Sequence, residues 1–473
     1  MKWPFPIWIA PFLLLLACTG RTEQFVPPEF VALEAQVDGA SALLKGTLSE
    51  SRVDRVGFIL HDDEQETVLQ GTLKGTSFTA EAKGLEVGKT YRWEAFAKAG
   101  NSEIRSREQS LTAPEGAIPI PDPVFKEQLI NWFDRDADGS LSVQEAKMAL
   151  EVDLKTDAIA SLQGLEYLPN LRILQAAGSE PGKGLLKELD VSHNPELRVL
   201  SCINNRITSL DVSHNPDLEH LSCWQNSLTE LDVSHNPKLL ELSCAQNYFT
   251  SLDVSHNPLL TQLHFNDTFV DDIDLQANSC IRIISCWRTP LTQLDVSPCK
   301  HLEELWSFST MITSFHAVGI SEIRSLDLGD SPLKSLDISD CSKIERLYLN
   351  NTDVPFSELP DLTQFPLTGL HLSTIAKDMP SDYLRNFPLL TELNICGFNG
   401  KSVDLSKNTK LEALWCASMG NVASLDLSAA PNLRELYMTG CPKLTTVYVA
   451  NGIQLQTLEK DEHTQIKYKE SVE

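Results

Sequence analysis

The sequence contains no long run of basic residues, and its acidic residues outnumber the basic ones by 65 to 39. The formal net charge is therefore −26. A field of that sign repels nucleic-acid phosphates and anionic lipid headgroups. We expect no nucleic-acid partner.

Sequence motifs of catalysis, zinc binding and thiol redox chemistry are also missing. There is no GxSxG nucleophile elbow, no Walker-type glycine loop and no HExxH helix. None of the eleven cysteines forms a CxxC pair, which argues against a zinc site or a thioredoxin-type motif. An enzyme would need a catalytic set in the irregular region 351–392, where the sequence offers none. We therefore predict a protein that is not an enzyme.

The apolar run near the N-terminus, Ile7 to Leu16, is too short to span a bilayer, which needs roughly 20 residues. It ends on Leu15-Leu16-Ala17-Cys18, which resembles the lipobox of bacterial lipoproteins. That resemblance implies a signal peptide over residues 1–17, lipidation of Cys18, and a membrane contact through the lipid anchor only. The mature chain would then lie outside the cytoplasm, at the outer membrane or cell surface. An ordinary signal peptide cut near Ala17 is the alternative.

A 21-residue repeat is the dominant signal in the rest of the chain. The segment LDVSHNP begins at Leu189 and recurs at Leu210, Leu231 and Leu252. A Leu-Ser-Cys segment recurs between them with the same period, at 200–202, 221–223 and 242–244. Degraded copies continue as far as Leu436, so the pattern from Leu174 onward predicts thirteen turns.

Each turn can be derived from its side-chain pattern. The Leu and the Cys two residues later point to the same side of a short strand, and the residues around them point outward. One turn cannot bury its own apolar face, so stacked turns must supply a shared core and a parallel sheet. Asn205, Asn226 and Asn247 follow the strand where the chain turns inward. Their amides can satisfy backbone groups at that bend.

This pattern, over residues 156–450, resembles the leucine-rich-repeat family and, within it, internalin J-like repeats, which also carry an inward Cys every 21 residues. The resemblance implies a horseshoe-shaped solenoid. We predict a ladder of reduced, buried thiols at positions 202, 223, 244, 286 and 416. Disulfides between turns are the alternative, but a strand spacing of ~4.8 Å exceeds the Cβ separation that disulfides prefer. Residues 451–473 are expected to form a C-terminal cap or tail.

The segments before the solenoid predict a multidomain chain. Residues 24–113 alternate apolar and polar positions between turn signals, as in an all-β sandwich. The segment Leu85 to Tyr91 resembles the tyrosine-corner region of fibronectin type III domains, which usually act as spacers. The prolines of residues 114–122 predict a stiff linker.

Residues 134–145 fit the pattern D-x-D-x-D-G-x5-E and resemble EF-hand and dockerin calcium loops. Such a loop binds one Ca²⁺ through oxygen ligands, here expected from Asp134, Asp136, Asp138, Ser140, Ser142 and Glu145. We predict flanking helices over Phe125–Phe133 and Val143–Val152, which would make residues 123–155 a helix-loop-helix cap. The sequence holds a single copy, whereas such loops usually occur in pairs. A capping loop without metal is the alternative.

Large aromatic residues occupy the outward positions of the repeat strands. That face of a solenoid is its concave surface, which these folds use for binding. We predict a ligand-binding patch of Trp224, His264, Trp287, Trp306, Phe308 and Tyr348. His371, Trp415 and Tyr437 are also outward. A protein partner is the first expectation, a glycan is the second because Trp and Tyr rings stack on sugars, and a purely structural envelope protein is a further alternative. Neighbouring rings could also simply cover one another.

Overall fold

The computed structural model describes residues 27–38, 41–62, 65–86, 89–112 and 118–469. They form two compact units that divide near residue 116. The predicted signal peptide and Cys18 lie outside the described residues. Within these ranges, no helix is both long enough and apolar enough to cross a membrane.

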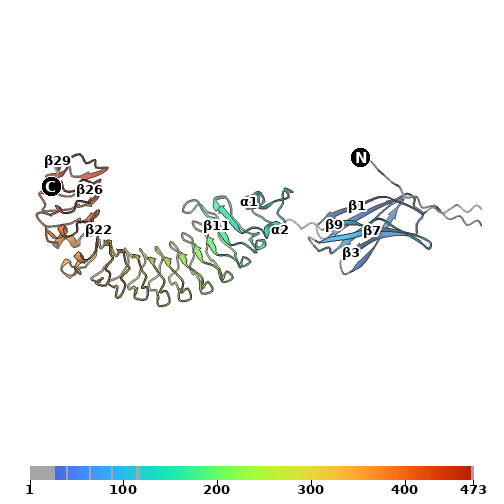
Figure 1. Cartoon of the computed structure of the whole chain (residues 1–473), viewed down its shortest axis with the longest axis horizontal. Helices are drawn as coiled ribbons and strands as arrows, with labels where there is room; N and C mark the ends of the chain where they lie inside the picture. Colours follow the sequence, from blue (N-terminus) through green and yellow to red (C-terminus); the bar gives the residue numbers. More distant parts are fainter. Residues whose placement is uncertain (1–26, 39–40, 63–64, 87–88, 113–117, 470–473) are drawn as a thin grey trace, which may run out of the picture. The chain divides into compact units, whose positions relative to one another are not determined.

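The N-terminal unit is built from two antiparallel sheets (Figure 1), as the alternating pattern of the sequence predicts. One sheet has the order β1 (Phe30–Asp38), β2 (Ser41–Leu48), β6 (Ser77–Lys83) and β5 (Thr72–Lys74). The other has the order β4 (Glu66–Gln70), β3 (Arg55–His61), β7 (Thr90–Ala99) and β8 (Ser102–Arg105), and β9 (Gln109–Thr112) also pairs with β7.

An aromatic cluster fills the core of this unit. The ring of Phe58 lies 5.0 Å from that of Phe78 and 5.6 Å from that of Trp93, centroid to centroid. At the start of β7, the hydroxyl of Tyr91 accepts a hydrogen bond from the backbone N–H of Glu86 at 2.9 Å. This is the hydrogen bond of a tyrosine corner. The wider similarity to fibronectin type III modules stays a prediction.

Two short helices precede the solenoid. Helix α1 (Pro123–Phe133) begins with Pro123, and the carboxylate of Asp122 accepts hydrogen bonds from the N–H groups of Val124 and Phe125. Helix α2 (Val143–Ala146) has a capping box between Ser142 and Glu145. The predicted continuation of this helix to Val152 is wrong. Residues Glu151–Lys155 instead form strand β10, because alternate residues there bury Val152 and Leu154 in the solenoid core.

The boundary between linker and solenoid also differs from the prediction. The predicted linker over 114–122 overlaps the described residues from 118 onward. Ile118 and Ile120 are buried there in the same apolar core as α1 and the first turns. Residues 118–122 therefore belong to the solenoid unit.

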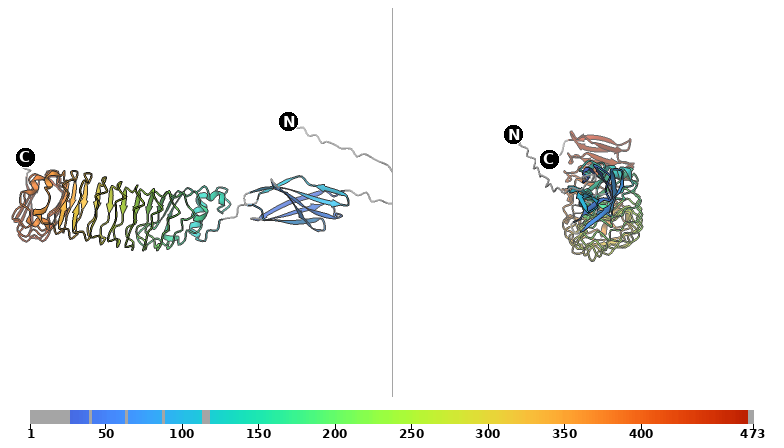
Figure 2. Two further views of the ribbon diagram at one scale, coloured as in Figure 1. Left: turned by 90° about the horizontal axis from the view of Figure 1, so that it is seen from below. Right: turned by 90° about the vertical axis from the view of Figure 1, so that its right-hand side faces the viewer.

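The solenoid contains a parallel sheet of fifteen strands, which confirms the predicted repeat architecture and adds a strand at each end. Leu200, Leu221 and Leu242 pair directly across neighbouring strands, and Figure 2 shows the turns stacked side by side. The expected C-terminal tail contributes the last strand. In order the strands are β10 (Glu151–Lys155), β11 (Ile173–Ala177), β12 (Val199–Ser201), β13 (His220–Ser222), β14 (Glu241–Ser243), β15 (Gln262–His264), β16 (Ile283–Ser285), β17 (Glu304–Trp306), β19 (Ser325–Asp327), β21 (Arg346–Tyr348), β22 (Gly369–His371), β23 (Glu392–Asn394), β24 (Ala413–Trp415), β26 (Glu435–Met438) and β28 (Thr457–Lys460).

Shorter elements complete the turns on the other side of the core. Two small parallel ladders pair β18 (Ser314–His316) with β20 (Ser335–Asp337), and β25 (Ser424–Leu427) with β27 (Thr446–Ala450) and β29 (Gln465–Lys469). Short 3-10 helices close the first turns and the two longer turns of region 351–392. They are η1 (Thr156–Ala158), η2 (Leu165–Tyr167), η3 (Phe356–Glu358), η4 (Leu362–Gln364), η5 (Ile375–Asp378) and η6 (Tyr383–Asn386).

Buried asparagines stabilise the bends, as predicted. The side-chain oxygen of Asn226 accepts from the N–H of Ile207 at 3.0 Å, and its amide nitrogen donates to the carbonyls of Cys202 and Cys223. The sequence reasoning missed a second ladder, formed by the Asn of each HNP segment. Asn215 is fully buried, and its amide nitrogen donates to the carbonyls of Val191 and Asn194 in the preceding turn.

The inward cysteines are free thiols in the core. Burial raises the pKa of Cys202 and of Cys286 to about 12. Both thiols therefore remain protonated and unreactive at neutral pH. They pack as small apolar side chains between the leucines.

Candidate binding surface

The long sheet lines the inner side of the arc that the solenoid describes (Figure 1). The outward residues of its strands therefore form the concave surface. All of the predicted patch residues lie on this surface and are half-buried. The rings thus partly cover one another and partly face the solvent.

A hollow of about 350 Å³ lies on the concave surface between Trp224 and Trp287. Two short side chains, Ser243 of β14 and Ala245 just past that strand, contribute to its lining together with His264 of β15. Burial lowers the pKa of His264, so the imidazole is neutral at pH 7. Two indole rings, a neutral imidazole and polar side chains therefore line this one hollow.

The next turns carry a stacked aromatic pair. Trp287 and Phe308 have ring centroids 5.2 Å apart and planes that differ by 6°, as their adjacent positions predict. The Arg288 guanidinium lies 5.0 Å from the centroid of the Trp287 ring. The indole N–H of Trp306 donates to the carboxylate of Glu304 at 3.1 Å.

A second aromatic cluster follows on the same surface. The ring of His371 lies 4.5 Å from that of Tyr348 and 5.4 Å from that of Trp415, and Trp415 stacks on Tyr437 at 5.5 Å. Only Tyr348 is in the predicted patch. Their distance from the inward leucines places His371, Trp415 and Tyr437 on this face. The irregular spacing of region 351–392 hides from the sequence that these rings contact one another and Tyr348.

Asp327 lies between the two clusters. It pairs directly with Trp306 on one neighbouring strand and with Tyr348 on the other. Burial raises the pKa of Asp327 to about 6, although a hydrogen bond from the Gly329 N–H to its carboxylate, 3.0 Å long, opposes that shift. Sequence reasoning passed over this residue because a single Asp in an outward position is unremarkable.

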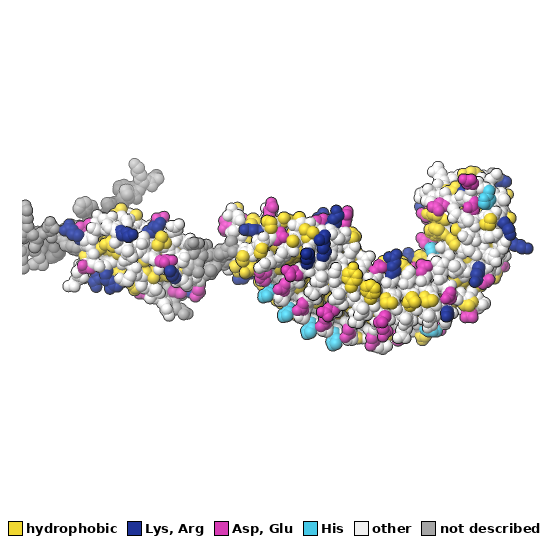
Figure 3. Space-filling view, turned by 180° about the vertical axis from the view of Figure 1, so that it is seen from behind, with side chains coloured by type: hydrophobic (Ala, Val, Ile, Leu, Met, Phe, Trp, Pro, Cys, Tyr) yellow, Lys and Arg dark blue, Asp and Glu magenta, His cyan; other side chains and the backbone are white. Residues whose placement is uncertain are grey.

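One flank of the solenoid carries an exposed apolar row that the sequence reasoning also missed. Tyr248, Phe269 and Met311 occupy the same position in their turns and are 58%, 56% and 55% exposed. The first two rings stack with centroids 6.4 Å apart. Figure 3 shows hydrophobic side chains gathered in a row along this flank. These residues recur at multiples of 21 positions, just after the inward bend of each turn, and that spacing could have predicted the row.

Another hollow of the solenoid lies outside the concave surface. It has a volume of about 850 Å³ and is lined by serines, acidic residues and the exposed His193 and His214. Its acidic side chains are already engaged, since the Asp190 carboxylate accepts a hydrogen bond from the Ser192 N–H at 2.9 Å. This hollow has no aromatic lining, and we regard the concave surface as the better binding candidate.

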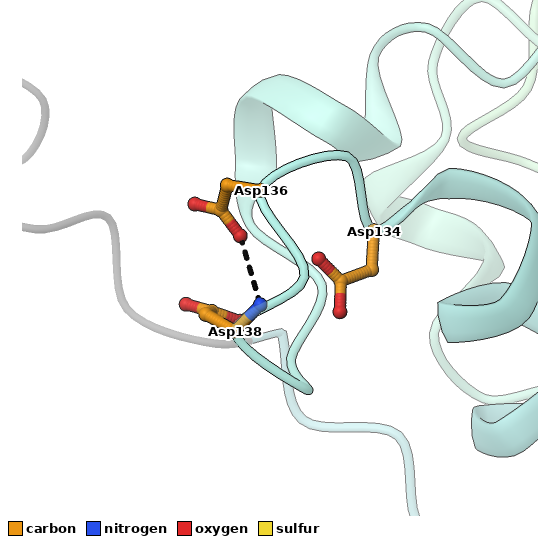
Figure 4. A group of neighbouring side chains, drawn as sticks. All are labelled: Asp134, Asp136 and Asp138. Atoms are coloured by element: carbon orange, nitrogen blue, oxygen red, sulfur yellow. Dashed lines mark hydrogen bonds between the residues drawn. The ribbon is translucent and has the colours of Figure 1, made fainter.

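The predicted calcium loop brings three of its expected ligands together. Carboxylate oxygens of Asp134, Asp136 and Asp138 lie within 4.8 Å of one another (Figure 4). Hydrogen bonds from the Gly139 N–H to Asp134 and from the Asp138 N–H to Asp136 fold the loop around them. One oxygen of Asp134 is buried without a hydrogen-bond partner in the described structure. This donor set fits a hard cation such as Ca²⁺.

Charge repulsion within the loop also fits a cation. The Asp138 N–H lowers the pKa of Asp136, but partial desolvation and the charges of Asp138 and Glu145 outweigh it and raise that pKa overall. A bound cation would relieve this repulsion.

The expected role of Glu145 as a ligand with both oxygens is not seen. One of its oxygens accepts from the N–H and the hydroxyl of Ser142, at 2.9 and 2.8 Å, and the other accepts from the Arg135 N–H at 2.7 Å. A buried carboxylate needs such donors, and this one caps α2. The Ser140 hydroxyl donates to Asp138 at 2.7 Å. Of the expected acidic ligands, the loop brings the carboxylates of Asp134, Asp136 and Asp138 together, and the ligand roles of Ser140 and Ser142 stay predictions.

The in-register parallel strands, the inward leucines and cysteines and the sheet-lined concave surface define a leucine-rich-repeat solenoid. Among solved structures, it is similar to the functional domain of InlJ from Listeria monocytogenes, which includes a cysteine ladder. That match has 25% identity, covers 68% of this chain and 75% of the other, and has a TM-score of 0.49. A second match, to the leucine-rich repeat domain of APL1B, has 15% identity, coverage of 60% and 74%, and a TM-score of 0.30. No protein-family model and no curated protein matches the chain.

The raised pKa of Asp327 predicts a stability cost at neutral pH. The pKa is about 6 in the folded state, against an ordinary value of 3.8 for an aspartate. The folded state therefore binds the proton more tightly, so the cost is present above pH ~6 and vanishes below pH ~4. We expect Asp327→Asn to raise the free energy of unfolding by about 1–2 kcal/mol at pH 7, allowing for partial exposure, and to leave it unchanged at pH 4.

Urea unfolding at the two pH values measures this difference. Glu459→Gln, which removes an exposed outward carboxylate on β28, is the matched control and should change little at either pH. Equal stabilities of the Asp327→Asn and parent proteins at pH 7 would contradict the assignment.

Proposed function

We propose that the protein is a non-enzymatic interaction scaffold whose concave surface binds a protein partner. The observation that carries the proposal is the series of half-buried aromatic side chains that recurs along one rigid sheet, from Trp224 to Tyr437. Large aromatic residues concentrate interface energy, and half-buried rings lose little conformational freedom when a partner covers them. The length of the set favours an extended segment of protein over a small metabolite.

A glycan is the second candidate, and the hollow between Trp224 and Trp287 favours it. Glu241, Gln246 and Asn266 contribute hydrogen-bonding groups to its lining. Indole faces stack on sugar rings, and polar neighbours bind hydroxyl groups. Screening of a glycan array against pull-down from cell extracts distinguishes these two ligand classes.

The proposal predicts that the concave tryptophans dominate the affinity. Trp287→Ala combined with Trp306→Ala should weaken partner binding at least ~10-fold, because buried aromatic anchors each contribute ~2 kcal/mol or more. The partner is first captured by crosslinking on intact cells, and binding is then measured by titration. His193→Ala with His214→Ala, which changes exposed residues outside the concave surface, is the matched control and should have little effect.

If the double tryptophan variant is folded and binds as well as the parent, the ligand lies elsewhere. That outcome would favour the third candidate, a structural envelope protein, in which the concave aromatics can change without consequence.

We further propose that the chain is a lipoprotein anchored through Cys18, with the N-terminal β unit acting as a spacer between membrane and solenoid. The lipobox-like Leu15 to Cys18 supports this proposal. Cys18→Ser should move the protein from the membrane fraction to the soluble fraction, because no acyl chain can then be attached. Ala17→Gly keeps the thiol and is the control. Retention of the Cys18→Ser protein in membranes would refute the anchor.

The third proposal is that the loop at 134–145 binds one structural Ca²⁺ beside the first solenoid turn. The cluster of Asp134, Asp136 and Asp138 and the buried, unpartnered oxygen of Asp134 support it. Bound Ca²⁺ would neutralise the repulsion among these carboxylates. Glu145 could join the ligand set only by giving up its hydrogen bonds to the backbone.

Calcium should therefore stabilise the parent protein and not the variant Asp134→Ala/Asp138→Ala. At a free concentration ~100 times the dissociation constant, binding contributes about 2.7 kcal/mol to the free energy of unfolding. Thermal unfolding with calcium or with a chelator measures it. Asp153→Ala, an exposed acidic residue on β10, is the control. A parent protein whose unfolding is indifferent to chelator would rule the site out.

A further inference from the structure

On the concave surface, strand β19 carries only short outward side chains between two strands with large ones. Its outward residues are Ser325, Asp327 and, just past the strand, Gly329. The preceding turn presents Trp306 and Phe308 at the equivalent positions, and the following turn presents Tyr348. A Cβ atom at Gly329 would lie 3.3 Å from the Asp327 carboxylate, so glycine keeps this carboxylate uncovered on that side. We call Trp306, Asp327 and Tyr348 the Asp327 site.

The spacing of the strands suits a planar or slender group. The strands that carry Trp306 and Tyr348 are two strand spacings apart, or about 9.6 Å at ~4.8 Å per strand. A separation of that size would admit one aliphatic chain or one guanidinium between the two aromatic side chains, next to the carboxylate of Asp327 on the strand between them. The two aromatic residues are held from outside by hydrogen bonds, Trp306 to Glu304 and the Tyr348 hydroxyl to Glu392 at 3.5 Å.

The Asp327 carboxylate has no compensating cation. No Lys, Arg or His within the described ranges forms an ion pair with it, and the Gly329 N–H donates a hydrogen bond to it. The hydroxyl of Ser325 beside it is 1% exposed and has no hydrogen-bond partner. The site therefore holds a carboxylate without a counter-charge and a buried hydroxyl without a hydrogen-bond partner.

Further charges near the site favour a positive ligand. Glu304 and Glu392 hold the two aromatic residues, and Asp330 adds a negative charge that raises the pKa of Asp327. Arg346, an exposed residue of β21, is the opposing charge, and His371 is neutral at pH 7 because burial lowers its pKa to about 4. Together with the chain's net charge of −26, this balance attracts cations.

From this geometry we infer that the Asp327 site binds the side chain of an arginine or lysine of the partner protein. The aliphatic part would lie between Trp306 and Tyr348, and the cationic group would pair with Asp327 and face the aromatic rings. A cation between ring faces above a carboxylate gains both a cation–π attraction and a charge-assisted hydrogen bond. The inference rests on the proposed function and narrows it to a basic segment of a partner protein.

The stability cost of Asp327 is consistent with this role. A half-buried, unpaired carboxylate destabilises the free protein, and a basic ligand removes that cost on binding. The same substitution should therefore stabilise the free protein and weaken its binding, which is the usual relation between stability and function at a binding site.

The test uses the full chain and two acetylated peptides. One is Gly-Arg-Gly-Arg-Gly, and in the other citrulline, which is uncharged and nearly isosteric, replaces both arginines. Calorimetric titration at pH 7 should show the arginine peptide binding about tenfold more tightly, with an affinity that falls as salt is added. Asp327→Asn should remove most of that difference. Glu459→Gln, which removes one outward carboxylate outside the site, should keep it.

Several outcomes overturn the inference. Equal binding of the two peptides by the parent protein does so. An equal loss of the arginine preference in the Glu459→Gln and Asp327→Asn proteins does so too, because the preference would then come from the general negative charge of the protein. Choline serves as a third probe. If it binds and the arginine peptide does not, the site takes a small ammonium compound rather than a protein side chain.

The failure of this inference can be separated from the failure of the proposed function. Trp287 lies outside the Asp327 site, so Trp287→Ala tests partner binding alone. If Trp287→Ala weakens partner capture while the arginine and citrulline peptides bind equally, the scaffold function stands and the cationic site is wrong. If Trp287→Ala leaves capture unchanged but the arginine preference depends on Asp327, the site stands and the tryptophan-centred interface is wrong.

Discussion

The solenoid depends on hydrogen bonds made by buried polar side chains at its bends. Every turn leaves backbone carbonyls and N–H groups inside the protein where strand pairing cannot reach them, and each unpaired group would cost about 1–3 kcal/mol. In the first turns, Asn226 and its equivalents satisfy these groups on one side of the core and Asn215 and its equivalents do so on the other. In the middle turns, the hydroxyls of Thr268, Thr289 and Thr310 donate to the carbonyls at the bend instead. Because each amide joins one turn to the turn before it, stacking and hydrogen bonding form together.

These hydrogen bonds hold the sheet rigid, and the rigid sheet determines where each outward side chain of the concave surface lies. The outward side chains repeat at a strand spacing of ~4.8 Å, so residues 21 positions apart in sequence become direct neighbours. Trp287 stacks on Phe308, and Asp327 lies between Trp306 and Tyr348, for that reason alone. The surface varies freely in sequence because the inward leucines, cysteines and asparagines supply the stability.

The sequence was most informative where its period is regular. The inward leucines, the cysteine ladder and the amides at the bend all followed from the 21-residue spacing, and so did the face that carries each tryptophan. The strand at 151–155 was missed because its apolar residues, Val152 and Leu154, continue the periodicity of the preceding segment, and only the neighbouring strand decides between helix and sheet. The hydrogen bonds of Glu145 could not be foreseen because a motif specifies residue types and not which donors surround a carboxylate. Asp327 could not be singled out since its significance comes from its neighbours on other turns.

The two ends of the long sheet are chemically different. Helices α1 and α2 share the core of the first turns, next to strand β10. At the other end, β28 is an edge strand with an exposed Glu459 followed by Lys460. Charged side chains on an edge strand discourage another strand from pairing with it. A stack of identical turns could in principle be extended by a second chain placed end to end, and these unlike ends disfavour such stacking.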